Sequence, residues 1–393
     1  MIKVHNLNYG FGNEESNILR RVSLEFASGT LNLICGPTGS GKSTLLKAIA
    51  QLNTKTAEST GEVWINDFQI SQKRPHQIAH LLGYVNQQPE SAFVAETVNE
   101  EIAFGMEQLG VSVSQMREKV NRISELLNIV ELLDFRTAEL SGGQQQRVAI
   151  AAALAAGQTT LLLDEPTSAL DEKSAMNLLK ILRHIADSTG TTILLSEHRY
   201  DRALPFADSI VVLKGDGSAA KLPATLDSIG MLLPEWISPR EHLAIATGKN
   251  LALEVIDLEA RYSKDQDPVI SKFNLELRES EIATLEGPNG SGKTTALLTI
   301  AGALPKHRGE IEISGSLALV PQRASDLLFL DTLAKEFAES DRHSKAQTNH
   351  TSGIFAKLVG RVDPKIHPRD LSVGQQLALV IAIQLATGSK LIL

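Results

Sequence analysis

The fold is decided by the run Leu31-Asn-Leu-Ile-Cys35 and the loop that follows it, Gly36-Pro-Thr-Gly-Ser-Gly-Lys-Ser-Thr44. An apolar run of strand length leads directly into a glycine-rich loop, and a helical segment follows at 43–51. Glycines at these positions let the backbone curl, so that successive N–H groups point into one concavity suited to an anion. The positive N-terminus of the helix adds to that field. The stretch therefore predicts a phosphate-binding loop between a strand and a helix.

The loop occurs a second time, as Gly287-Pro-Asn-Gly-Ser-Gly-Lys-Thr-Thr295, and shorter motifs return in the same order. Val85-Asn-Gln87 is echoed by Val320-Pro-Gln322, and Leu140-Ser-Gly-Gly-Gln144 by Leu371-Ser-Val-Gly-Gln375. The separation between the copies shrinks along the chain, so the second copy is the shorter one. We interpret the chain as two homologous domains and not as a short solenoid repeat.

Prolines and glycines place the junction between the copies in residues 226–250, and a strand-like run starts near Leu251. We therefore expect a first domain at 1–225, a linker at 226–250 and a second domain at 251–393. In each copy strand-like runs alternate with helical ones, which is typical of an α/β fold with a largely parallel core sheet.

The second copy ends at an earlier point of the repeat than the first copy does. Its last residues, Lys390–Leu393, align with Thr160–Leu163 of the first copy, where Asp164 and Glu165 follow. The matching carboxylates are absent from this chain. The apolar ending predicts a buried strand that is cut short, and favours a truncated second domain.

Composition limits the classes of function. The chain has 393 residues, a net charge of −8 and one cysteine, Cys35. The charge argues against a surface that coats nucleic acid, and a single thiol excludes a disulfide framework. The N-terminus lacks the apolar core of a signal peptide, and no run reaches the ~20 apolar residues that a membrane span needs. We expect any membrane role to be peripheral.

Several polar residues lie where phosphate chemistry needs them. Lys42 is placed to reach the β- and γ-phosphates, and Ser43 offers a hydroxyl to Mg²⁺. Asp164 and Glu165 end a buried apolar run, where a carboxylate is costly unless a cation or hydrogen bonds compensate. Asp164 therefore suits Mg²⁺, and Glu165 suits the attacking water. His198 follows another apolar run, 191–196, where it can touch the γ-phosphate.

The first copy resembles an ATP-binding-cassette (ABC) ATPase over its whole length. The matching motifs stand in family order: Walker A Gly36–Ser43, Q-loop Gln87, signature Leu140–Gln144, Walker B Leu161–Asp164, catalytic Glu165, D-loop Ser168–Asp171 and switch His198. The resemblance implies two tandem P-loop NTPase domains. Each has a parallel core sheet, an antiparallel β subdomain and a helical signature subdomain.

The same resemblance implies ATP and Mg²⁺ as ligands. The implied nucleotide-binding residues of the first copy are Phe11, Gly36, Pro37, Thr38, Gly39, Ser40, Gly41, Lys42, Ser43, Thr44, Ser141, Gly142, Gly143 and Gln144. Those of the second copy are Tyr262, Gly287, Pro288, Asn289, Gly290, Ser291, Gly292, Lys293, Thr294, Thr295, Gln322, Ser372, Gly374 and Gln375. The implied metal ligands are Ser43, Gln87, Asp164, Thr294 and Gln322, and the catalytic residues are Glu165, His198 and Gln87. Phe11 and Tyr262 are expected to stack on adenine, with Tyr9 competing for that place.

A narrower resemblance lies around the Q-loop. Asn86-Gln-Gln-Pro-Glu90, then Thr97-Val-Asn-Glu-Glu101 and Ile102-Ala-Phe-Gly105, is similar to the ATPases of energy-coupling-factor (ECF) transporters. These take up vitamins, vitamin precursors or transition-metal ions in prokaryotes. The resemblance implies a transmembrane coupling subunit and a substrate-binding membrane subunit as partners, with the ATPase at the cytoplasmic face of the cell membrane. Taken alone, Glu100 and Glu101 are most simply a solvated helix face.

The family also implies that the two domains pair head to tail, each ATP lying between one Walker A and the other signature. Lys42 would then face Ser372-Val-Gly-Gln375, where Val373 replaces a glycine, whereas Lys293 would face the intact Ser141–Gln144. Arg147 after the first signature is replaced by Ala378 after the second. A β-branched residue resists close backbone approach and positive φ, so we expect unequal sites.

Three alternatives stay open. A soluble tandem ABC protein acting on ribosomes or nucleic acid usually carries a long charged linker, a coiled coil or a zinc insertion, and none is evident, so no nucleic acid is expected. The ATPase of another ABC transporter class is disfavoured only by the Q-loop segment. A non-hydrolysing scaffold is disfavoured by Glu165 and His198.

Overall fold

The computed structural model describes residues 1–10, 17–37, 39–52, 57–225, 227–228, 248, 250–262, 267–321 and 324–393. The chain divides into two compact units, Met1–Arg240 and Glu241–Leu393. Phe11, Thr38, Gln322 and most of the expected linker lie outside the described residues.

In the residues that the structure describes, the first unit contains two sheets with helices around them. Its strands are β1 (Ile2–Gly10), β2 (Asn17–Phe26), β3 (Leu31–Cys35), β4 (Glu58–Ile65), β5 (Phe68–Gln69), β6 (Leu82–Val85), β7 (Thr160–Asp164), β8 (Thr192–Ser196), β9 (Ser209–Leu213) and β10 (Ala219–Pro223). Its helices are α1 (Lys42–Ile49), α2 (Pro75–Ile78), α3 (Val98–Gln108), α4 (Val113–Leu127), α5 (Gly142–Leu154), α6 (Glu172–Thr189) and α7 (Tyr200–Ala203). One sheet has the order β10-β9-β3-β8-β7-β6 and the other β2-β1-β4-β5.

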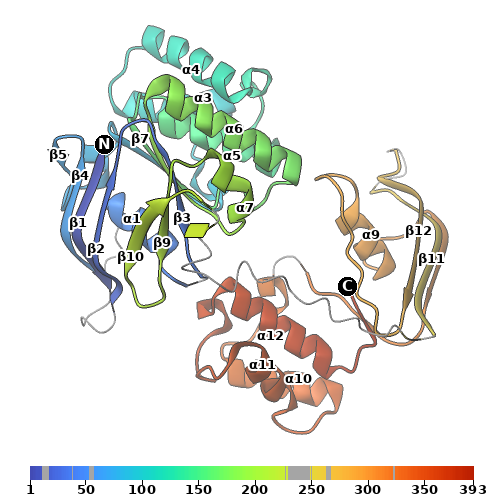
Figure 1. The fold of residues 1–393 in the computed structure, drawn as a ribbon. Coiled ribbons are helices and arrows are strands. Elements are labelled where there is room, and N and C mark those ends of the chain that lie inside the picture. Colours follow the sequence, from blue (N-terminus) through green and yellow to red (C-terminus); the bar gives the residue numbers. More distant parts are fainter. Residues whose placement is uncertain are drawn as a thin grey trace. The chain divides into compact units, whose positions relative to one another are not determined.

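The core strands are apolar on both faces because both faces are covered. All residues of β3, β7, β8 and β9 are buried. Alternate side chains enter different cores: Leu33 packs with the helices α3–α6, whereas Ile34 packs with α1 and the antiparallel sheet. Figure 1 shows α3–α6 gathered on one side of the unit and β1, β2 and β4 on the other. Such two-sided burial is typical of parallel sheets, and it confirms the predicted α/β class.

Register brings the ends of three strands together. In the parallel ladders Ile34 is paired with Ser196, and Ser196 with Asp164. The glycine loop after β3, the acids at the end of β7 and the segment after β8 therefore begin at the same edge of the sheet. The strand predicted at 31–35 has those bounds, and the helix predicted at 43–51 runs from Lys42 to Ile49.

The second unit repeats part of this plan. Its elements are β11 (Leu251–Ala260), β12 (Ile270–Arg278), α9 (Lys293–Ile300), β13 (Arg308–Ile313), β14 (Leu317–Ala318), α10 (Leu333–Ser344), α11 (His350–Val359), α12 (Val373–Ala386) and β15 (Leu391–Ile392). The antiparallel sheet has the order β12-β11-β13, and β14 pairs in parallel with β15. In the part of the chain that the structure describes, no helix is both long enough and apolar enough to cross a bilayer.

The counterpart of β3 in the second unit, residues 282–286, is not a strand. In the first unit β3 is hydrogen-bonded to β8 and β9. The second copy reaches only Leu393, which aligns with Leu163, so these 393 residues hold no counterpart of β8 or β9. Ile282 is accordingly 84% exposed. A similar glycine loop follows this run in both copies, but only the run with partner strands forms a ladder.

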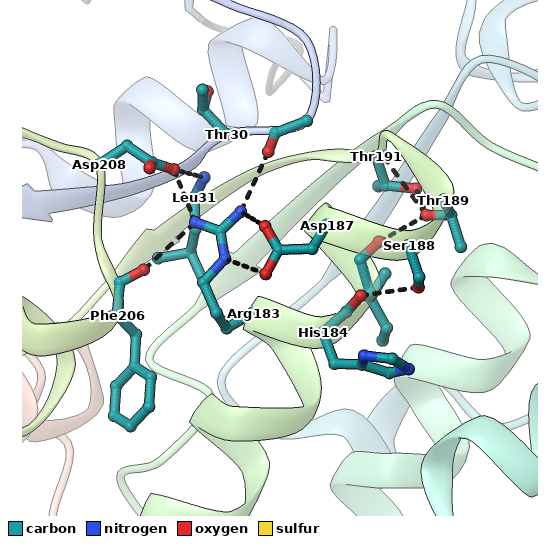
Figure 2. Close-up of polar contacts among 12 residues, drawn as sticks. Thr30, Leu31, Arg183, His184, Asp187, Ser188, Thr189, Thr191, Phe206 and Asp208 are labelled. Atoms are coloured by element: carbon teal, nitrogen blue, oxygen red, sulfur yellow. Dashed lines mark hydrogen bonds and ion pairs between the residues drawn. The ribbon is translucent and has the colours of Figure 1, made fainter.

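Arg183 on α6 joins helix and sheet at the opposite end of β3 (Figure 2). Its guanidinium donates to both carboxylate oxygens of Asp187, 3.1 and 2.6 Å away, and to Asp208 Oδ2 at 2.6 Å. It also donates to the Gly29 carbonyl at 3.1 Å. Asp208 Oδ2 in turn accepts the N–H of Leu31, the first residue of β3. The arginine thus fixes where β3 starts relative to α6 and β9.

We expect Arg183→Met to lower the free energy of unfolding of the first unit by about 2 kcal/mol, because hydrogen bonds to charged groups contribute more than neutral ones. The matched control is Arg136→Met, which removes a surface ion pair with Glu96 and should cost at most about 0.5 kcal/mol. Urea unfolding followed by tryptophan fluorescence checks this, since Trp64 lies in β4. Equal losses in the two variants would contradict the assigned role of Arg183.

Candidate functional site

The matching glycines of the two loops have similar φ angles. The φ angles are 152°, 81° and 95° at Gly36, Gly39 and Gly41, and 156°, 80° and 90° at Gly287, Gly290 and Gly292. A Cβ on Gly36 would also lie 2.5 Å from Ser40 Oγ, so no other residue fits there. The remaining predicted loop residues flank these glycines or open α1 and α9: Pro37, Ser40, Ser43, Thr44, Pro288, Asn289, Ser291, Thr294 and Thr295.

The loop lysines fold back onto their own loops. Lys42 Nζ donates to the carbonyls of Gly36 and Pro37, at 2.8 and 3.1 Å. Lys293 makes the same two contacts, at 2.7 and 2.8 Å, with Gly287 and Pro288. Lys42 is 6% exposed, and its burial lowers the pKa of the ammonium, against the charge of nearby carboxylates. Each lysine is therefore held by neutral carbonyls, which an anion in the loop can replace.

Asp164 and Ser43 form a pair of oxygens suited to Mg²⁺. Ser43 Oγ donates to Asp164 Oδ1 at 2.9 Å, and Ser196 Oγ donates to the same oxygen at 2.7 Å. Adjacent ligands of an octahedral ion with 2.0–2.1 Å bonds lie about 2.9 Å apart. The donor chemistry and spacing of Ser43 and Asp164 therefore fit this cation.

Three residues predicted to be catalytic meet at one carboxylate. Glu165 Oε2 accepts a hydrogen bond from Gln87 Nε2 at 2.7 Å, and Glu165 Oε1 lies 2.7 Å from His198 Nε2. The backbone of Glu165 has φ 50°, and its N–H donates to Ser196 Oγ at 3.0 Å. Gln87, which was also a predicted metal ligand, thus contacts Glu165 and not the Ser43–Asp164 pair.

The last residue of β8 and the residues that follow it hold the turn at Glu165 in place, and the sequence analysis identified only His198 among them. Ser196 binds Asp164 and the Glu165 N–H, as described above. Glu197 is 3% exposed and accepts the N–H of Thr167 at 3.0 Å. Burial raises the pKa of Glu197 to about 7, against the hydrogen bonds from Thr167. The missed signal was a carboxyl at the end of a buried strand that lies beside the strand carrying Asp164.

The signature motif builds a helix cap in both units. The Ser141 N–H and Oγ donate to Gln144 Oε1 at 2.8 and 2.9 Å. In the second unit the Ser372 N–H donates to Gln375 Oε1 at 3.0 Å, and Ser372 Oγ accepts the N–H of Gln375 at 3.3 Å. These are the reciprocal bonds of a capping box at the start of α5 and α12. The serine and the glutamine of the motif thus have a structural role in capping the helix, apart from any contact with nucleotide.

The expectation that the position of Gly142 and Val373 needs a positive φ is wrong. Gly142 and Val373 each open a helix, and neither has positive φ. A Cβ on Gly142 would meet only Ala169 Cβ, at 4.0 Å, and Val373 is 80% exposed. The fold itself tolerates a side chain at this position. Gly142 and Val373 can therefore differ in function only if a ligand or another domain approaches them closely. Gly143 is the tighter position, since a Cβ there would lie 3.2 Å from Leu170 Cδ2, whereas a Cβ on Gly374 would meet open space. Inequality of the two sites stays a prediction.

The expectation that Glu101 lies on a solvated helix face is also wrong. Glu101 is 7% exposed, and its Oε2 accepts the N–H groups of Val94 and Ala95 at 2.9 and 2.8 Å. Its neighbour Glu100 is exposed and forms a capping box with Thr97. The second unit repeats the arrangement, since Glu336 Oε1 accepts from residues 329 and 330 at 2.8 Å each.

The aromatic candidates for adenine differ in where they lie. Tyr9 is 4% exposed and packs in the core next to the antiparallel sheet, so its ring is not available for stacking. Tyr262 is 61% exposed, and its hydroxyl lies 3.0 Å from Thr295 Oγ1, just after the second loop. It is therefore beside the loop with an accessible ring.

The titration of Glu197 predicts a pH dependence of stability. A carboxyl whose pKa is about 7 when folded and 4.5 otherwise stabilises the fold below pH 4.5, and loses that contribution as pH rises through 7. We expect wild type to lose up to about 3 kcal/mol relative to Glu197→Gln between pH 4.5 and 8. Thermal melts across this range check it, with the exposed Glu100→Gln as control. Parallel pH profiles for wild type and Glu197→Gln would refute the buried titration.

Comparisons with known proteins agree with this geometry. A family model described as ABC transporter matches residues 19–168 and 270–393. A putative ABC transporter ATP-binding protein of Streptomyces avermitilis is 31% identical, with all of this chain and 83% of that protein covered. A putative HMP/thiamine import ATP-binding protein of Bacillus subtilis is 27% identical, with 100% and 80% covered.

Solved structures extend the likeness to the fold. The cbiO1 protein of Clostridium perfringens, described as part of the ABC transporter complex cbiONQ, is 26% identical with a TM-score of 0.52. The match covers 60% of this chain and 96% of that one. Together with a family model that matches twice and spans most of the sequence, this shows that the chain belongs to the ABC transporter ATP-binding family, whose members hydrolyse ATP.

Proposed function

We propose that this chain powers an ECF-type importer of a vitamin, a vitamin precursor or a metal ion, as a peripheral subunit at the cytoplasmic face of the membrane. The observation that carries the proposal is the continuous path from Glu165 through Gln87 to an exposed, rigidly held loop. The Bacillus subtilis relative named for HMP/thiamine import, and the likeness to a component of the cbiONQ complex, support it.

The first site supplies each function that phosphoryl transfer to water needs. Lys42 exchanges its two loop carbonyls for the β- and γ-phosphates of ATP. Mg²⁺, when bound at Ser43 and Asp164, neutralises charge on those phosphates. Glu165 orients the attacking water and accepts its proton, since each of its oxygens keeps a lone pair beyond the contacts with Gln87 and His198.

We expect Lys42→Ala to weaken ATP binding and Glu165→Gln to spare binding but lower kcat by about 10²–10³-fold, because one neutralises phosphate charge and the other activates water. Both variants are made with Lys293→Ala, so that only the first site reports. ATP turnover and equilibrium ATP binding are the measurements, and Glu125→Gln, a surface change, is the control. Wild-type turnover in a variant lacking both Lys42 and Glu165 would overturn these roles.

The path to a membrane partner starts at Gln87. From this residue the chain passes through the helical turn Pro89–Ala92 to Val94, whose N–H is held by buried Glu101. Val94 is 63% exposed. A movement of Gln87 that follows the state of Glu165 therefore acts on a segment anchored at its far end, where an apolar side chain faces solvent.

The second unit repeats this arrangement of an exposed apolar residue held by a buried carboxylate, with a larger side chain. The N–H of Phe329 is held by Glu336, and Phe329 is 78% exposed. An apolar residue that is exposed and also fixed by a buried carboxylate has no evident role in the stability of its own unit. We therefore assign Val94 and Phe329 to contacts with the transmembrane coupling subunit, the partner that ECF transporters provide.

We expect Val94→Asp together with Phe329→Asp to abolish co-purification with the membrane subunits while leaving ATP affinity unchanged within about twofold, because a charge in an apolar contact is costly. Val113→Asp is the matched control, since Val113 is 62% exposed at the start of α4. Assembly that survives in the double variant contradicts the assigned surface. A wild-type chain that co-purifies with ribosomes or nucleic acid, and with no membrane protein, would favour the soluble alternative.

A further inference from the structure

Tyr200 contacts the first residue of the phosphate loop from the far side of the site. It lies two residues after His198 and opens α7. Its hydroxyl accepts the N–H of Gly36 at 2.8 Å and donates to the carbonyl of Gly36 at 2.7 Å. The side chain is 2% exposed, and its ring packs in the core beneath the helices. One hydroxyl thus satisfies both backbone groups of a single glycine.

Gly36 is the residue where such a hold matters. Its φ of 152° lies outside the range of other residues, and a Cβ would also lie 2.6 Å from the Leu213 carbonyl. The direction of every N–H group in the loop depends on how the chain leaves β3 at this point. A fixed peptide at Gly36 is therefore a condition for a fixed anion-binding concavity.

The Gly36 carbonyl has two donors, and one of them is needed elsewhere. Lys42 Nζ donates to it at 2.8 Å, and Tyr200 donates at 2.7 Å. When Lys42 turns to phosphate, the carbonyl loses a charge-assisted partner. A buried carbonyl left without any donor carries a large desolvation cost, which would oppose ATP binding. Tyr200 removes that cost because its hydroxyl stays in place.

We propose that Tyr200 is a positioning residue of the ATP site, whose hydroxyl holds Gly36 in the phosphate-binding conformation while Lys42 exchanges its loop carbonyls for phosphate. This inference rests on the role proposed above for Lys42. Burial raises the pKa of Tyr200 to about 12, so the hydroxyl keeps the proton that it must donate at neutral pH.

The lysine of the second loop is held in the same way as Lys42. Lys293 makes the same contacts to the carbonyls of Gly287 and Pro288. The one tyrosine in the sequence of that copy, Tyr262, bonds to Thr295 and not to Gly287. The hydroxyl contact to the first loop glycine is therefore described for the first site.

The test is Tyr200→Phe in the full chain, with Lys293→Ala so that only the first site binds. ATP affinity is measured with EDTA present, which prevents turnover, and tripolyphosphate is measured as a competitor. We expect Kd to rise 5- to 30-fold for both probes by the same factor, because the loss lies in the phosphate loop. Lys42→Ala in the same assay should abolish binding whatever Tyr200 does, which separates failure of this inference from failure of the proposed site.

The matched control is Ser209→Ala. Ser209 Oγ donates a buried hydrogen bond to Asn32 Oδ1 at 2.7 Å, also onto β3 but toward the end away from the loop. Both variants should lower the thermal midpoint by similar amounts, whereas only Tyr200→Phe should lose ATP affinity. An affinity for ATP within twofold of the Ser209→Ala value would show that Tyr200 is a structural residue only.

If Tyr200→Phe does not fold, a measurement on the unmutated chain tests the same inference. Hydrogen exchange at the Gly36 amide should be slow without ATP and equally slow with it, because Tyr200 holds the N–H in both states. Exchange that becomes faster when ATP binds would mean that the hydroxyl releases Gly36, and would overturn the inference.

Discussion

Parallel pairing of β3, β7 and β8 is the constraint on which the site depends. In that ladder Ile34, Ser196 and Asp164 are neighbours across three strands. Three segments therefore start from one edge of the sheet, although they are far apart in sequence. They are the glycine loop after β3, the turn with Asp164 and Glu165, and the segment with His198. The hydrogen bonds from Ser43 and Ser196 to Asp164 then need no long loops or flexible side chains.

The sequence predicted those parts of the site that are local. The strand at 31–35 and the two loops could be predicted from neighbouring residues in the sequence. The glycines of both loops have the expected conformations. Glu197 and Tyr200 were missed because their partners, Thr167 and Gly36, lie in segments that are distant in sequence, after β7 and β3. Glu101 could have been found, since it lies on the buried stripe of α3 with Val98 and Ile102.

The second unit shows how far a repeat can be carried over. Its loop glycines, its capping box and its buried Glu336 reproduce the first unit, because each depends only on neighbouring residues. The run 282–286 does not reproduce β3, because a strand depends on partners that lie elsewhere in the chain. The repeated sequence predicted the local conformation in both copies. It predicted the β ladder of the strand before the loop only in the first copy.

The unpaired run in the second unit has a consequence for the chain in solution. Among the residues that the structure describes, 282–286 lie outside every β ladder, and Ile282 and Leu285 are exposed. A groove lined by Phe273, Leu275, Leu277 and Leu393 adjoins them. An open, apolar stretch of backbone is a template for pairing with another copy. Such exposed backbone favours self-association, which increases with protein concentration.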